Sequence, residues 1–192
     1  LVSGPTRLAD PAGVEVVHVE TAAEMLAACR RALPADVAVC AAAVADWKVA
    51  AQAEQKLKKR EGEAAPGIAL TPNPDILASL SAAGNERPAL VIGFAAETED
   101  LIENAARKRE RKGCDWILAN DVSRESGTFG GADNLVHLVD GSGSEAWPKM
   151  TKQQVAERLA ARIADHSAAT PGRAPDRSRH PAGHDARRRR QH

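Results

Sequence analysis

The strongest constraint on the fold is a run of eight residues without a polar side chain, ALVIGFAA at 89–96. A strand that is apolar on both faces is typical of the centre of a parallel sheet covered by helices on both sides. The following segment, TEDLIENAARKRERKG at 98–113, has instead the pattern of a charged amphipathic helix. A buried strand followed by such a helix is the repeating unit of an α/β protein.

The same alternation of strand and helix extends along most of the chain. Further strands are predicted at 14–19, 36–43, 67–70 and 114–120. Helices are predicted after the capping-box residues Thr21 and Glu24, and after Asn73, which is placed as an N-cap before Pro74. We therefore expect a three-layer, Rossmann-like, mostly parallel sheet with helices on both faces.

The last part of the chain predicts an antiparallel addition to this sheet. NLVHLVD and SEAWPKM, separated by GSG, have the pattern of a hairpin near one edge of the sheet. Thr151 and Gln154 then open a final helix. From Ser167 to His192 the chain contains seven Arg and no Leu, Ile, Val, Phe or Trp, so we expect a domain at 1–166 and a disordered tail at 167–192.

Composition and cysteine spacing limit the number of domains, the location of the protein and its partners. A chain of 192 residues with 43% hydrophobic residues suits one domain with a buried core. Cys29, Cys40 and Cys114 are odd in number and lack CxxC spacing, which predicts reduced thiols and a cytoplasmic protein. No apolar run reaches the roughly 18 residues that a membrane span needs, so no membrane partner is expected. The basic tail is interpreted as solvated, and no nucleic-acid partner is expected.

Ligands of parallel α/β sheets bind beyond the carboxyl ends of the strands, and a basic segment lies at one such place. Residues 48–61 follow the strand at 36–43 and carry Lys56, Lys58, Lys59 and Arg60. Lysines on a flap would close on an anionic substrate and neutralise phosphate oxygens. A solvated basic loop is the alternative, because runs of charge usually serve solvation.

Two further features favour an anionic ligand. The turn NPDI at 73–76 predicts a helix N-terminus, where free backbone N–H groups suit a phosphate, although an ordinary capped helix has the same pattern. Lys108 and Lys112 lie four residues apart and share a helix face. The glycine motifs of dinucleotide and P-loop sites, metal-ligand spacings and a nucleophile elbow are all missing from the sequence.

Five strings in a fixed order resemble the family of bacterial phosphopantothenoylcysteine synthetases over residues 1 to about 165. They are AAVADW, KLKK, NPDIL, GFAAET and KRERKGCDWILANDV. The resemblance implies a ligase of coenzyme A biosynthesis that activates phosphopantothenate with CTP as an acyl-cytidylate, which the amine of cysteine then attacks. It also implies a homodimer, Mg²⁺ that accompanies CTP, and FMN only where a decarboxylase domain is fused upstream.

The resemblance also implies roles for individual residues. Lys56 would be the catalytic flap lysine. The CTP pocket would consist of Asp46, Lys56, Pro74, Asp75, Ile76, Leu77, Phe94, Lys108 and Lys112. Ala42 and Ala43 would line the acyl-cytidylate cleft through their backbone, and the metal ligands stay unassigned.

The chain departs from the family pattern at its beginning. Family members start with a strand and a glycine-rich turn, followed by an Asn, Ser and Gly cluster that holds the intermediate, whereas this sequence starts at LVSGP. We therefore expect a fragment of the synthetase domain, and its alternative function is a non-catalytic nucleotide-binding or dimerisation module. A Rossmann-type NAD oxidoreductase shares the layered architecture but requires a glycine fingerprint that is missing here.

Overall fold

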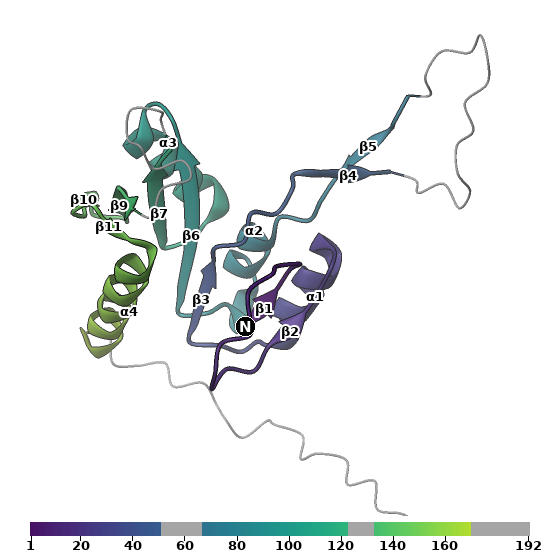
Figure 1. Ribbon diagram of the computed structural model, residues 1–192, viewed down its shortest axis with the longest axis horizontal. Helices are drawn as coiled ribbons and strands as arrows, with labels where there is room; N and C mark the ends of the chain where they lie inside the picture. The colour runs from purple at the N-terminus through teal and green to yellow at the C-terminus, as the bar shows by residue number, and fades with distance from the viewer. Residues whose placement is uncertain (51–66, 123–132, 170–192) are drawn as a thin grey trace, which may run out of the picture.

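The computed structural model describes residues 1–50, 67–122 and 133–169, and its centre is a five-stranded sheet (Figure 1). The strand order is β10-β9-β7-β6-β3. The strands are β3 (Val37–Cys40), β6 (Leu90–Glu97), β7 (Trp116–Asp121), β9 (Val136–Val139) and β10 (Ser144–Ala146). β3, β6 and β7 run parallel, whereas β9 is antiparallel to β7 and β10. The expected α/β fold with an antiparallel hairpin at one edge is confirmed.

Helices cover both faces of this sheet, as the sequence predicted. α3 (Leu101–Lys112) buries Ala105 in a core cluster on one face. α4 (Lys152–Ala169) buries Val155 and Leu159 in a second cluster on the other face. The strands between them, β6 and β7, are buried along most of their length, because most of their residues are apolar on both faces.

A smaller group of elements lies beside the open side of β3 (Figure 1). It contains β1 (Val2–Ser3), β2 (Val17–His18) and α1 (Ala22–Arg31). β1 pairs with β2 in a separate parallel sheet, and α1 contacts α2 (Ile76–Ser81). The capping box predicted at the start of α1 is present, since Thr21 and Glu24 exchange side-chain and backbone hydrogen bonds.

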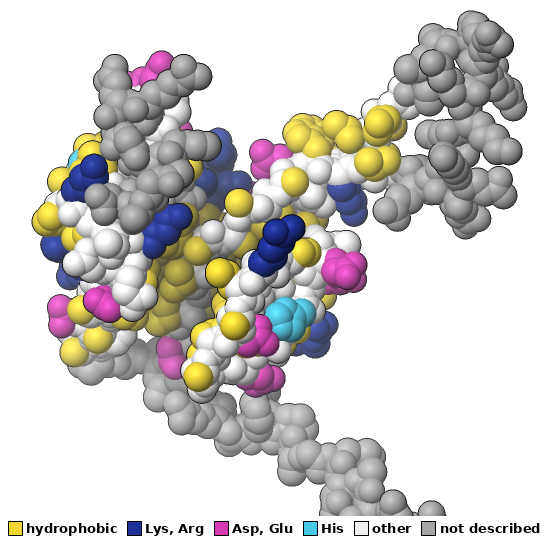
Figure 2. All heavy atoms as spheres, viewed as in Figure 1, with side chains coloured by type: hydrophobic (Ala, Val, Ile, Leu, Met, Phe, Trp, Pro, Cys, Tyr) yellow, Lys and Arg dark blue, Asp and Glu magenta, His cyan; other side chains and the backbone are white. Residues whose placement is uncertain are grey.

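β4 (Trp47–Val49) and β5 (Leu70–Pro72) pair antiparallel and project from the body of the molecule as a two-stranded arm (Figure 1). Figure 2 shows hydrophobic side chains gathered along this arm. The exposed ones are Trp47 (59%), Val49 (48%), Ile68 (69%) and Leu70 (57%). The remaining elements are η1 (Gly84–Glu86) and the antiparallel pair β8 (Asp133–Asn134) and β11 (Met150–Thr151).

Several predicted boundaries were wrong. The strand expected at 67–70 begins at Leu70, and the strand expected at 14–19 is reduced to β2. Asn73 is not the N-cap of α2, because that position belongs to Asp75, whose carboxylate accepts a hydrogen bond from the amide of Ala78. α4 continues to Ala169, three residues into the segment expected to be a disordered tail, and residues 170–192 lie outside the described part.

Within residues 1–50, 67–122 and 133–169, no helix is both long enough and apolar enough to cross a membrane.

Candidate functional site

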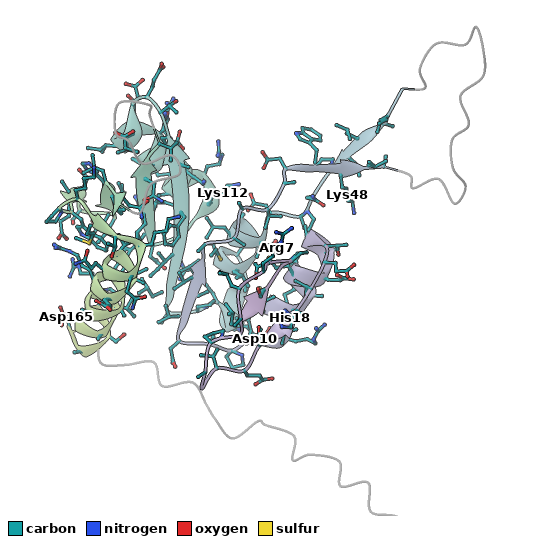
Figure 3. The ribbon with its side chains drawn as sticks, in the orientation of Figure 1. Arg7, Asp10, His18, Lys48, Lys112 and Asp165 are labelled. Carbon is teal, nitrogen blue, oxygen red and sulfur yellow. The ribbon has the colours of Figure 1, made fainter. Side chains whose placement is uncertain are left out.

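A cavity of about 690 Å³ lies beyond the carboxyl ends of β3 and β6. Its polar part is lined from four separate segments: the residues after β3, the turn before α2, the end of β6 and one face of α3. Figure 3 shows Lys112 of α3 at the junction between the main sheet and the α2 side of the molecule. The site therefore occupies the place where parallel α/β sheets bind ligands.

Two hydrogen bonds join the turn before α2 to the chain that leaves β3. The amide of Asn73 donates to the carbonyl oxygen of Asp46 at 2.8 Å. The side-chain Nδ2 of Asn73 donates to the carbonyl oxygen of Ala45 at 2.9 Å. Because its side chain bridges two segments, Asn73 does not cap the helix, and Asp75 takes that position.

Asp75 has two partners at the rim of the cavity. One carboxylate oxygen caps α2, and the other accepts a hydrogen bond from the ammonium group of Lys112. Partial burial raises the pKa of Asp75, but the bonds from Lys112 and Ala78, with the charges of Lys112 and Arg111, outweigh it. The pKa of Asp75 therefore lies below its ordinary value, and the carboxylate is ionised at neutral pH.

Lys108 lies one helical turn before Lys112 and reaches the end of β6. Its Nζ donates to the carbonyl oxygen of Phe94 at 2.8 Å. This bond leaves the other ammonium protons of Lys108 available to a ligand, since an ammonium group carries three donors. α3 thus presents two cations to the cavity, as the four-residue spacing predicted.

Gly93 of β6 allows α2 to approach the sheet closely. A Cβ atom at this position would lie 2.5 Å from Cδ2 of Leu77 and 2.9 Å from Cδ1 of Ile117. Leu77 therefore packs directly over the strand and fixes the turn that carries Asp75. A larger residue at position 93 would displace α2 and with it one wall of the cavity.

Nine of the eleven residues predicted for the site line this cavity. They are Ala42, Asp46, Pro74, Asp75, Ile76, Leu77, Phe94, Lys108 and Lys112. Ala43 is exposed and is not among the lining residues. Lys56 lies outside the described residues, as does the rest of the predicted flap at 51–66.

The structure changes one interpretation and adds residues that the sequence did not suggest. The N-terminus of α2 was expected to offer free amides to a phosphate, but α2 has only six residues and its Ala78 amide is already bonded to Asp75. Trp47, Asn73 and Cys40 also line the cavity. Asn73 was recognisable as a turn residue, but its bond to Ala45 depends on a contact between segments 28 residues apart.

The two cysteines in the apolar part of the cavity are protonated. Burial, together with the proximity of Cys29, Cys114 and Asp75, raises the pKa of Cys40 to about 11. Burial also raises the pKa of Cys29. These thiols are therefore poor nucleophiles at neutral pH, in agreement with their interpretation as packed, reduced cysteines.

The described residues contain no group of three or more His, Cys, Asp or Glu side chains that could hold a metal ion. A Mg²⁺ ion bound through the phosphates of a nucleotide needs only one or two carboxylates, because it keeps several waters. Asp46 lines the cavity and fits such a role. The donor set therefore suits a metal ion that arrives with an anionic ligand.

The fold and the site define the class of the protein. It is an α/β protein with a mostly parallel sheet whose strand-end cavity is lined by two lysines of α3. Residues 1–166 match the model of the DNA/pantothenate metabolism flavoprotein C-terminal domain. The chain belongs to this family, which confirms the resemblance stated from the sequence.

Curated relatives agree with this assignment. The chain is 43% identical over 153 residues to the coenzyme A biosynthesis bifunctional protein CoaBC of Vibrio vulnificus, which covers 79% of the chain and 38% of the relative. The CoaBC protein of Escherichia coli is 40% identical over 162 residues, covering 83% of the chain and 39% of the relative. The chain thus spans about two fifths of the length of the curated relatives it matches.

Solved structures show the same fold. The C-terminal domain of a CoaBC protein superposes with a TM-score of 0.69 at 31% identity, covering 88% of this chain and 74% of that one. The DNA/pantothenate metabolism flavoprotein from Streptococcus pneumoniae gives a TM-score of 0.68 at 16% identity, covering 86% and 80%. The second likeness supports the fold alone.

Proposed function

We propose that this domain binds CTP in the strand-end cavity and acts as a phosphopantothenate–cysteine ligase of coenzyme A biosynthesis. The observation that carries the proposal is the convergence of Asp46, Asp75, Phe94, Lys108 and Lys112, which come from four segments, on one cavity. Membership of a family whose curated relatives are CoaBC proteins supports the same function.

The reaction proposed for the site has two steps. The carboxylate of phosphopantothenate attacks the α-phosphorus of CTP, and pyrophosphate leaves with the electrons of the broken P–O bond. The amine of cysteine then attacks the acyl carbon, forms the amide, loses a proton to solvent and displaces CMP. Negative charge develops on pyrophosphate in the first step, so cations placed beside the phosphates stabilise its departure.

The lysines of α3 are the described residues best placed for this role. Lys108 is held at the end of β6 by its bond to the Phe94 carbonyl, and Lys112 is held by Asp75. Each lysine is therefore positioned before the nucleotide arrives, which lowers the ordering cost of binding. Asp46 would approach Mg²⁺ carried by the triphosphate, and this ion would add further neutralising charge.

Three assignments in this proposal rest on the family resemblance. Lys56 would close on the reacting phosphates from its flap, and the backbone at Ala42 and Ala43 would line the acyl-cytidylate cleft. FMN belongs to the proposal only for a longer protein with a decarboxylase domain. A cytoplasmic location agrees with the free cysteines at positions 29, 40 and 114.

Direct titration of CTP tests the binding step. We expect Lys108→Gln to weaken CTP binding by roughly 10- to 100-fold, because a bond to a charged group contributes about 1.5–3 kcal/mol. Arg107→Gln is the matched control, since it removes a positive charge from the exposed part of the same helix, where Arg107 bonds to Asn104. Calorimetric titration with CTP and Mg²⁺ measures both variants, and equal losses in the two would reject the site.

Pyrophosphate release tests the reaction separately from binding. With CTP, Mg²⁺, phosphopantothenate and cysteine, we expect pyrophosphate release to depend on phosphopantothenate. In this assay Lys56→Gln should reduce the rate of release far more than Lys59→Gln. Similar small effects of both substitutions would mean that this basic segment is a solvated loop and has no role in the reaction.

A non-catalytic nucleotide-binding or dimerisation module is the second candidate, and the arm favours it. The four exposed hydrophobic side chains of the β4–β5 arm present the kind of surface that a second copy of the chain would cover. We propose that the arm is the homodimer contact in either case. CTP binding without phosphopantothenate-dependent pyrophosphate release would select this second function.

A further inference from the structure

A second cavity of about 510 Å³ lies between α4 and the strands β3, β6 and β7. α4 packs on the face of the sheet opposite to α3, so this α4 cavity is on the other side from the lysines of α3. Its polar lining residues are Asn120, Asn134 and Lys152, and none of them lines the strand-end cavity. The α4 cavity therefore has polar groups of its own, which the proposed CTP site does not use.

Asn134 is a buried polar residue with unused hydrogen-bonding capacity. It is 7% exposed, and in the described ranges its side-chain amide forms no hydrogen bond. Its backbone is fixed, because β8 pairs with β11 and places Asn134 opposite Met150. Buried polar side chains in native proteins are nearly always hydrogen-bonded, so an amide without a protein partner points to a polar ligand or water in the cavity.

Lys152 supplies positive charge to the α4 cavity. It is the first residue of α4, an 18-residue helix whose first turn contains no acidic residue. The partial positive charge at a helix N-terminus adds to that of the ammonium group. Lys152 forms no ion pair within residues 1–50, 67–122 and 133–169. This end of the cavity is therefore suited to an anion.

Asn120 brings a second amide to the cavity from the end of β7. Its position in the sheet is fixed by pairing with Ala96 of β6 and Val136 of β9. It is partly buried and has no side-chain hydrogen bond among the residues that the structure describes. Asn120 and Asn134 together give the cavity two amide oxygens, which can accept hydrogen bonds from an amine.

The α4 cavity adjoins the strand-end cavity. Val39, Ala41 and Phe94 line both of them. Phe94 also contacts the lysines of the proposed CTP site, since its carbonyl oxygen accepts the bond from Lys108. A small molecule in the α4 cavity would therefore lie beside a ligand that fills the strand-end cavity.

The lining of the α4 cavity matches a small α-amino acid. The ammonium group of Lys152 can bind a carboxylate, and the oxygens of Asn120 and Asn134 can accept hydrogen bonds from the amino group. Apolar residues of α4 line much of the rest, among them Val155 and Leu159, and a thiol packs against such residues as a small hydrophobe. A single lysine suits the one charge of a carboxylate better than the nearly two charges of a phosphate.

We propose that the α4 cavity binds cysteine, the amino-acid substrate of the ligase, and selects it by its carboxylate. Lys152 pairs with the carboxylate, and Asn120 and Asn134 hold the amino group beside the residues that the two cavities share. This inference rests on the proposed function, because the acyl group that cysteine attacks would form in the strand-end cavity. The nucleotide and the amino acid would then bind on opposite faces of the sheet, so CTP binding would not need Lys152.

Kinetics with two amines test the role of Lys152. Lys152→Gln should raise the KM for cysteine roughly 10- to 100-fold, because it removes a hydrogen bond between charged groups. Cysteamine has the same amine and thiol but no carboxylate, so its kcat/KM should change little. Titration with CTP and Mg²⁺ should give the same affinity for Lys152→Gln and the unsubstituted chain. Equal losses with cysteine and cysteamine would mean that Lys152 does not bind the carboxylate, and would overturn the assignment.

Arg158→Gln is the matched control for the loss of a positive charge. Arg158 lies on the same helix, is exposed, pairs with Glu145 and lines neither cavity. We expect the KM for cysteine in this variant to stay near that of the unsubstituted chain. A rise as large as that in Lys152→Gln would mean that the net charge of α4 sets the KM, and would reject a contact with Lys152.

Nuclear magnetic resonance tests the site without catalysis. Titration of the unsubstituted chain with cysteine should shift the side-chain amide signals of Asn120 and Asn134, whereas cysteamine should shift them less. Shifts without pyrophosphate release would support this site and reject the proposed ligase reaction. Pyrophosphate release with unmoved amide signals would reject this site and support the ligase reaction.

Discussion

At the scale of single residues, Asp75 determines much of the geometry of the site. Its carboxylate starts α2 and also holds Lys112, so one side chain fixes both a backbone turn and a cation. Asn was a reasonable candidate for the same cap, since Asn73 precedes a proline, but its amide is used between segments. Both Asn73 and Asp75 are acceptable N-caps by local pattern. The contact of Asn73 with Ala45 decides between them, and the local sequence does not show that contact.

The lowered pKa of Asp75 predicts that the unsubstituted protein and Asp75→Asn differ in stability by an amount that depends on pH. Asp75→Asn preserves an N-cap but removes the ion pair, so it should lower stability at neutral pH by at most about 1 kcal/mol, because the pair is partly exposed. A carboxyl group whose pKa is lower in the folded protein than in the unfolded one stabilises the fold at pH values above its unfolded pKa of about 4. This contribution is lost as the pH falls through the folded pKa.

Thermal unfolding of both proteins between pH 7 and pH 2 measures this difference. The melting temperatures should converge as the solution becomes more acidic than about pH 4. Lys112→Gln, which removes the other half of the pair, should show the same convergence. A difference that stays constant with pH would mean that the ion pair does not stabilise the fold.

The close packing around Gly93 predicts that a larger side chain at this position destabilises the fold. Gly93→Ala places a methyl group within 3 Å of Leu77 and Ile117, so it should destabilise the fold by about 1–3 kcal/mol. Gly141→Ala is the control, because nothing lies within 4 Å of a Cβ atom at that position. Denaturant unfolding should also show that Leu77→Ala recovers part of the loss in the double variant, and additive losses would contradict the proposed contact.

At the scale of elements, the strongly patterned segments were predicted well. β6, α3, β7 and α4 have long periodic or fully apolar sequences, and each forms within three residues of its expected bounds at both ends, except that α4 extends to Ala169. The capping boxes at Thr21 and Thr151 also form. Local signals of this kind are strong because they repeat over several residues.

The elements that were predicted poorly depend on partners distant in the sequence. β5 begins at Leu70 because it pairs with β4, and this pairing joins residues on either side of segment 51–66. The arm was therefore not expected, and residues 48–50 were instead assigned to a basic flap. Of the candidate site, the lysines of α3 followed from helical spacing, whereas the role of Asn73 required the three-dimensional contact.

The exposed hydrophobic side chains of the β4–β5 arm predict self-association of the chain, which a charged residue on the arm should weaken. Leu70→Lys places an ammonium group on the exposed apolar side of the arm, so it should shift the chain from dimer toward monomer. Ile102→Lys on α3 is the control, since Ile102 is similarly exposed but lies away from the arm. Sedimentation velocity measures both variants, and an unchanged dimer in Leu70→Lys would exclude the arm as the contact.

At the scale of the whole molecule, the described residues form two groups of unequal burial. The β1, β2 and α1 group contains only Met25 and Ala28 as buried residues, whereas β6 and β7 are buried along most of their length. The smaller group contacts the rest of the fold mainly where α1 meets α2. We therefore expect the two groups to differ in local stability.

Amide hydrogen exchange on the native protein tests this difference. Amides of α1 and β2 should exchange at a lower opening free energy than those of β6 and β7, because fewer apolar contacts oppose their opening. Identical opening free energies in the two sets of amides would show that the chain unfolds as one cooperative unit.

The order of the strands along the chain also has a kinetic consequence. β6, α3 and β7 form a continuous unit in residues 90–121, so their pairing closes only short loops and should form early in refolding. The pairing of β3 with β6 spans a longer stretch of chain, so β3 should add later, to an edge of β6 that has already formed.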